Sequence, residues 1–213
     1  GMIFPLDEIK KISQFCKENN VKLHLDGARL WNASVATGIS LKEYSHYFDS
    51  VSLCLSKTLG APIGTVLVGD KKFILKANHF KKQNGGGIRQ SGLLASMAIV
   101  AIDENFTKLQ KTHDMAKELG DLCKQKGILL EHPVDTNFVF VDIAANKMNP
   151  DKLIEISDKY GVKIYSGRVS LHYQISQESF EKAKKVIVEA FEFAKEHPYE
   201  ESHNFKFYTA ENK

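Results

Sequence analysis

The chain has 213 residues, of which 43% are hydrophobic, and 29 Lys and Arg against 26 Asp and Glu give a formal net charge of +3 at pH 7. This content suffices for one or two domains with buried cores, and so small a basic excess does not indicate nucleic-acid binding. No apolar run could span a membrane and no secretory signal is visible. We therefore expect a cytoplasmic protein with no metal site and three reduced cysteines.

In the first half, apolar periodicity predicts a helix over residues 6–19, with Ile9, Ile12 and Cys16 on its buried face. Ser40 and Glu43 form a capping box for a short helix. The predicted strands are apolar runs at residues 21–25, 50–55 and 65–68, and a basic helix is predicted at 71–82.

In the second half, a helical region is predicted from about residue 89 to 126, with an interruption near Asn105. Asn149 and Pro150 start another helix, and Ser176 caps a last one that ends near residue 196. The predicted strands lie at residues 138–142, 162–165 and 169–173. We place a boundary near residue 105, which separates residues 1–105 from a smaller α/β part at 106–198 and a tail at 199–213.

Two of the predicted strands end in groups that could share a site. Asp26 follows one strand and Lys57 follows the next, and open α/β sheets bind ligands outside the carboxyl ends of their strands. A pyridoxal-phosphate enzyme needs this pair, because the lysine forms a Schiff base and the acid keeps the pyridine nitrogen protonated. Spacing alone favours a solvated lysine and a helix-capping aspartate instead.

Other groups could bind anions. Arg29 and Arg168 carry planar forks that suit a carboxylate, although each alone would be interpreted as a surface arginine. The three glycines at residues 85–87 could present N–H groups to an anion or form a flexible turn. His24 and His172 lie in strand patterns and are expected to be structural, because no second metal ligand stands at a suitable spacing.

Taken as strings, these segments resemble the low-specificity threonine aldolases, and the fungal members above all. The matching strings are HLDGARLWNA at 24–33, DSVSLCLSK at 49–57, LGAPIG at 59–64, GGGIRQ at 85–90 and RVSLH at 168–172. They stand in the family's order, and the resemblance extends to about residue 196. Thr58 departs from the pattern, since the family usually has glycine after the lysine and a β-branched residue restricts the backbone.

The resemblance implies an α/β fold of the aspartate-aminotransferase type, fold type I, with pyridoxal 5'-phosphate as cofactor. Residues 1–105 would be the C-terminal portion of the cofactor-binding large domain. The resemblance assigns catalysis and cofactor binding to Lys57 and Asp26, further cofactor contacts to Arg89 and His24, and the substrate carboxylate to Arg29 and Arg168.

The implied reaction is retro-aldol cleavage of L-threonine or L-allo-threonine to glycine and acetaldehyde, by a homodimer or homotetramer with a shared active site. Family members supply a phosphate-binding turn and a ring-stacking histidine from an earlier segment, so we expect this chain to be a fragment with little activity of its own. The alternative is a non-catalytic remnant that serves as a self-associating or interaction domain, since exposed strand edges favour association.

Overall fold

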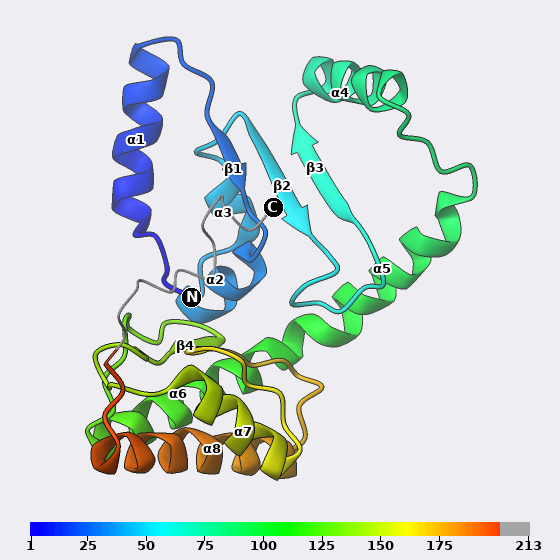
Figure 1. The fold of residues 1–213 in the computed structure, drawn as a ribbon. Helices are drawn as coiled ribbons and strands as arrows, with labels where there is room; N and C mark the ends of the chain where they lie inside the picture. Colours follow the sequence, from blue (N-terminus) through cyan, green and yellow to red (C-terminus); the bar gives the residue numbers. More distant parts are fainter. Residues whose placement is uncertain (201–213) are drawn as a thin grey trace. The chain divides into compact units, whose positions relative to one another are not determined.

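A computed structural model of the chain describes residues 1–200, which divide into two compact units (Figure 1). The first unit comprises Gly1–Lys117, Asp135–Asn137 and Leu171–Gln174, and the second comprises Glu118–Val134, Phe138–Ser170 and the described residues from Ile175 onward. The boundary proposed near residue 105 stays a prediction about domains. Most of the predicted tail at 199–213 lies outside the described residues.

The first unit is built on a three-stranded sheet of order β1-β2-β3 (Figure 1). Its strands are β1 (His24–Asp26), β2 (Ser50–Cys54) and β3 (Thr65–Gly69). β1 pairs with β2 in parallel and β3 pairs with β2 in antiparallel. The second and third strands confirm the prediction to within one residue, whereas β1 begins three residues later than predicted and includes Asp26.

Helices connect and flank these strands. They are α1 (Leu6–Glu18), α2 (Leu30–Thr37), α3 (Leu41–Ser45), α4 (Lys71–Gln83), α5 (Ser91–Asn105), a 3-10 turn η1 (Phe106–Lys108) and α6 (Leu109–Lys126), which enters both units. The turn η1 confirms the predicted interruption near Asn105. Ser40 caps α3 by accepting a hydrogen bond from the Glu43 N–H at 3.1 Å, but the Glu43 carboxylate bonds to Tyr47 instead of completing the capping box.

The buried face of α1 differs from the prediction at one position. Ile9 and Cys16 are buried, but Ile12 is 41% exposed. Ser13 is buried in its place, and its hydroxyl donates to the Tyr47 carbonyl at 2.7 Å. Positions 9, 13 and 16 lie within a narrow stripe of the helix, which leaves position 12 at the stripe's edge.

Trp31 fixes α2 against the end of β2. Its indole N–H donates to the Cys54 carbonyl at 2.9 Å, and its ring meets Phe106 edge-on with centroids 5.7 Å apart. Leu55 and Leu59 are buried in the same hydrophobic cluster. The segments after β1 and β2 therefore share one core.

The second unit contains β4 (Phe138–Phe140) paired in antiparallel with β5 (Arg168–Ser170), and α7 (Pro150–Tyr160) packed on α8 (Gln177–Glu196). Asn149 caps α7 and Ser176 caps α8, as predicted. The predicted strand at 162–165 is wrong. Its Val162 N–H donates to the Ser157 carbonyl at 3.1 Å, so the segment bonds back to α7 and not to another strand.

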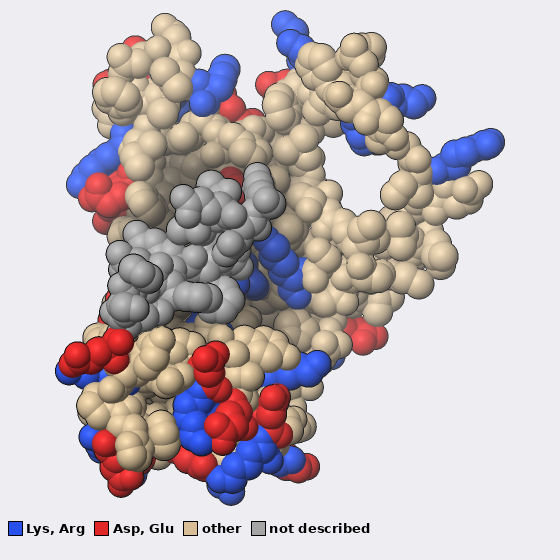
Figure 2. Space-filling model, viewed as in Figure 1, with Lys and Arg blue, Asp and Glu red and all other residues tan. Residues whose placement is uncertain are grey.

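Apolar side chains remain exposed on β3, α4 and α5. Val66, Leu67 and Val68 are consecutive, so both faces of β3 present apolar surface, with exposures of 39–43%. Figure 2 shows basic side chains projecting from α4 and a largely uncharged surface over α5. Within residues 1–200, no helix is both long and apolar enough to cross a bilayer.

Gly27 offers a test of how tightly β1 and β2 pack at their ends. A Cβ there would lie 2.7 Å from the Ser52 carbonyl oxygen and 3.2 Å from a Leu53 methyl carbon. Gly27→Ala should therefore lower the free energy of unfolding by about 1–3 kcal/mol in urea titrations. Gly92→Ala is the control, because nothing lies within 4 Å of its added Cβ. This substitution in α5 should raise the free energy of unfolding by about 1 kcal/mol at most. Equal effects of the two substitutions would contradict the packing argument.

Candidate functional site

The structure distributes the predicted site residues over two units. His24, Asp26, Arg29, Lys57 and Arg89 belong to the first unit, and Arg168 belongs to the second. Within the first unit, the parallel pairing of β1 with β2 makes both strands run toward the same edge of the sheet. Asp26 is the last residue of β1 and Lys57 lies in the turn after β2, so both belong to the same edge of the sheet, as the sequence predicted.

The turn after β2 exposes Lys57 while burying the residues that follow it. The Lys57 side chain is exposed, whereas Thr58 and Leu59 are 2% and 0% exposed. Gly60 has a φ of +71°, and a Cβ there would overlap the Tyr173 hydroxyl. Only glycine suits both constraints, so the turn that presents the lysine amine is sterically fixed.

The acidic end of β1 is held by its own backbone. One oxygen of the exposed Asp26 carboxylate accepts from the Ala28 N–H at 3.1 Å, which is the contact of an Asx turn. Upstream on the same strand, His24 Nδ1 lies 2.8 Å from Ser50 Oγ across the β1–β2 pair. The first contact orients Asp26 at the carboxyl end of β1, and the second orients His24 at the start of the strand.

A chain of hydrogen bonds links Arg29 to α6. Arg29 Nη1 donates to Thr58 Oγ1 at 3.1 Å, Thr58 Oγ1 donates to Asn32 Oδ1 at 2.7 Å, and Asn32 Nδ2 lies 3.0 Å from His113 Nε2. Because arginine can only donate, the threonine oxygen accepts from it and the threonine proton goes to Asn32. The amide N–H then donates to an unprotonated His113 Nε2. Asn32 and His113 are 1% and 7% exposed, so water does not substitute for these partners.

His172 binds the backbone of the lysine turn. Its Nδ1 accepts from the Gln174 N–H at 3.4 Å, so the proton on Nε2 donates to the Lys57 carbonyl at 3.3 Å. Burial lowers the pKa of His172, the backbone bonds oppose this shift, and the Arg29 charge adds to it. His172 is thus a satisfied histidine, as expected, but its contact with the lysine turn was not foreseen.

Two N–H groups of the glycine-rich segment before α5 are already bonded to the end of α4. The Gly85 N–H donates to the Lys82 carbonyl at 3.0 Å and the Gly86 N–H to the Lys81 carbonyl at 2.7 Å. These two N–H groups therefore end α4 and are not directed at an anion. Arg89 follows in a turn and is exposed.

Arg168 is held within the second unit by an aromatic ring. Its guanidinium carbon lies 4.7 Å from the centroid of Phe138, and its backbone N–H donates to Ser166 Oγ at 3.3 Å. A guanidinium over a ring face is stabilised by the ring quadrupole. Its predicted convergence with Arg29 stays a prediction.

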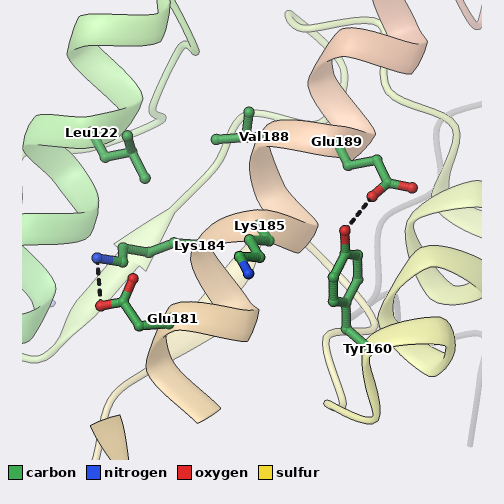
Figure 3. A pocket seen from close by; sticks show the side chains of 7 residues that line it. All are labelled: Leu122, Tyr160, Glu181, Lys184, Lys185, Val188 and Glu189. Carbon is green, nitrogen blue, oxygen red and sulfur yellow. Dashed lines mark hydrogen bonds and ion pairs between the residues drawn. The ribbon is translucent and has the colours of Figure 1, made fainter. Parts of the chain in front are cut away.

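A surface pocket of about 400 Å³ lies in the second unit (Figure 3). Most of its polar side chains are already paired, either with another lining residue or with a residue beside the pocket. Lys184 donates to Glu118 at 2.6 Å and contacts Glu181 at 2.7 Å, and the Tyr160 hydroxyl donates to Glu189 at 2.7 Å. The lining includes none of the predicted site residues, so the sheet edge of the first unit is the better candidate.

The buried His113 should make the stability of the protein depend on pH. Burial lowers the pKa of His113 below its ordinary value near 6.5, against a smaller opposing effect of Asp114. Between the folded pKa and about 6.5, the unfolded chain binds more protons than the folded chain, so stability is lost as pH falls through this window. The urea midpoint should therefore fall between about pH 7 and pH 5. His113→Gln should reduce this dependence, the exposed His46→Gln should not, and equal slopes for the two variants would refute the assignment.

Comparison with known proteins places this geometry in a family. The beta-eliminating lyase family matches residues 1–146. The chain is 60% identical over 212 residues to the low-specificity L-threonine aldolase of Candida albicans, covering 98% of this chain and 57% of that protein. It is 51% identical over 213 residues to the enzyme of that description in Saccharomyces cerevisiae, covering 100% of this chain and 55% of that protein. The chain thus spans little more than half the length of these relatives.

A solved structure supports the same assignment. A protein from Listeria monocytogenes, described as a candidate L-allo-threonine aldolase, superposes with a TM-score of 0.74 at 26% identity, covering 89% of this chain and 58% of that one. The predicted α/β fold of type I is therefore confirmed, and so is the resemblance to the low-specificity threonine aldolases. Since the family match spans well over half of its residues, the chain belongs to the beta-eliminating lyase family.

Proposed function

We propose that the gene product containing this chain cleaves L-threonine or L-allo-threonine to glycine and acetaldehyde with pyridoxal phosphate. One observation carries the proposal: Asp26 ends β1 and Lys57 follows β2, so the two groups lie at the same edge of a parallel strand pair. The sequence around both residues belongs to a chain that is 60% identical to the Candida albicans aldolase.

The donor set at this edge suits the cofactor. Lys57 offers an exposed amine for the aldehyde group, and Asp26 offers an exposed carboxylate for a protonated pyridine nitrogen. Once bound, pyridoxal phosphate supplies an electron sink for the substrate's α-carbon. His24 would lie beside it and Arg89 would serve its phosphate, roles that rest on the sequence resemblance.

The chain's own residues would bind and orient the amino acid. Arg29 would hold the substrate carboxylate through its planar fork, and its position is fixed by the bond to Thr58. Arg168 receives a similar role from the sequence resemblance alone. Orientation matters because alignment of reacting groups can contribute about 7–11 kcal/mol to lowering a barrier.

The proposal includes a cytoplasmic homodimer or homotetramer. Exposed apolar side chains on β3 and α5 support self-association, because such surface is costly in water. The same surface suits the alternative, a non-catalytic interaction domain. Glycine production from threonine by the complete gene product, with added cofactor, separates the two, since an interaction domain would associate without cleaving.

Lys57 should be the residue that attaches the cofactor. Borohydride reduction of the cofactor-loaded gene product, followed by peptide mapping, should place the label on Lys57. Lys57→Ala should abolish the label, because no amine would remain after β2. It should also abolish the near-visible absorbance of the cofactor bound to the lysine. Lys82→Ala, an exposed position at the end of α4, is the control and should keep both. A label on a different lysine in the wild type would refute the assignment.

Replacing Asp26 should impair turnover more than cofactor attachment. Asp26→Asn removes the anion that would pair with the ring nitrogen, and loss of one such electrostatic group typically lowers kcat about 10²–10³-fold. The label on Lys57 should persist. Asp70→Asn is the matched control, because Asp70 caps α4 and asparagine caps equally well. Turnover of Asp26→Asn close to that of the control would exclude the proposed role.

A further inference from the structure

We propose that Thr58 and Asn32 are positioning residues for Arg29, and that His113 anchors them from α6. The inference rests on the proposed function, because it takes Arg29 as the group that binds the substrate carboxylate. It adds three residues to which the sequence resemblance gave no role. The motif comparison marked Thr58 only as a departure from the family's glycine.

The Thr58 hydroxyl links Arg29 to Asn32. Thr58 Oγ1 connects the two side chains, because it accepts from Arg29 Nη1 at 3.1 Å and donates its single proton to Asn32 Oδ1 at 2.7 Å. The side chain is 2% exposed, so neither bond competes with bulk water. Thr58 also follows Lys57 directly, so the same turn presents the lysine amine and accepts the hydrogen bond from Arg29.

Each hydrogen bond from Arg29 through Thr58 and Asn32 to His113 has a fixed direction. Arg29 can only donate, so each later group in the chain has a fixed role, ending with an unprotonated His113 Nε2 as acceptor. Asn32 is 1% exposed and cannot turn its amide to solvent without a cost. The buried network therefore holds the guanidinium in one orientation before any ligand arrives, which reduces the freedom lost on binding.

A purely structural role does not explain the histidine at position 113. Its Nδ1 is buried and has no hydrogen-bond partner within residues 1–200, which is unfavourable for a group placed only to fill a core. An aliphatic side chain would avoid that cost. The bond from Asn32 to Nε2 explains why a histidine occupies the position, because an aliphatic residue would leave the buried amide without its acceptor.

The test uses Thr58→Val and Thr58→Ser in the complete gene product, with KM and kcat for threonine measured separately. Thr58→Val keeps the shape but removes the hydroxyl, and should raise KM about tenfold, the factor that corresponds to one hydrogen bond to a charged group. Thr58→Ser keeps the hydroxyl and should restore KM. The cofactor label on Lys57 should survive in both variants. A folded Thr58→Val protein with unchanged KM would overturn the proposal, and if that variant does not fold, Thr58→Ala is judged by the same criterion.

A second measurement needs neither cofactor nor substrate. In urea unfolding of the cofactor-free protein, Arg29→Met and Thr58→Val should lower the midpoint non-additively, because both remove the same bond. Additive changes in the urea midpoint would overturn the proposed positioning of Arg29 by Thr58, even if the enzyme is active. If the wild type cleaves no threonine while the two substitutions remain coupled, the positioning of Arg29 by Thr58 is supported and the proposed function fails. The two failures are therefore distinguishable.

Discussion

The parallel hydrogen bonding of β1 to β2 determines where the chemistry of the first unit can lie. In the observed register, Asp26 lies opposite Ser52, and β2 continues to Cys54 before the turn that carries Lys57. A shift of one residue would turn the Asp26 side chain to the other face of the sheet. The hydrogen bond from the Gly27 N–H to the Ser52 carbonyl stabilises the observed register. The close approach of the two backbones leaves no room for a Cβ at position 27.

Strong local signals made much of this fold predictable. Asn149 followed by Pro150, and Ser176, are cap residues whose effect depends on their immediate neighbours, and the helices began where they indicated. Helix α2 was not predicted, because its apolar residues follow no clear helical period and it begins without a side-chain cap. The run at 162–165 has the composition of a strand, but its hydrogen bonds go to α7, a choice made by tertiary contacts that no local pattern reveals.

The candidate site divides in the same way. The placement of Asp26 and Lys57 at one edge could be predicted because strand ends are visible in the sequence and parallel strands share an edge, whereas their proposed roles came from the sequence resemblance. The partners of Arg29 could not be found, since Thr58 and Asn32 are 26 positions apart and Asn32 and His113 are 81 apart. Nothing in the sequence indicates that a histidine midway along the chain should meet an asparagine of α2. The fold alone brings them together.

Thr58 illustrates how a departure from a family motif can be accommodated. A β-branched residue restricts the backbone, yet Thr58 is not among the non-glycine residues with positive φ in the described chain. Its backbone therefore does not adopt the left-handed conformation that favours glycine, so glycine's freedom is not required there. A glycine would remove the hydroxyl and leave Arg29 Nη1 and the buried Asn32 Oδ1 to find other partners. Because an unpaired buried carbonyl is costly, the Thr58 hydroxyl gives Asn32 Oδ1 a partner that a glycine would not supply.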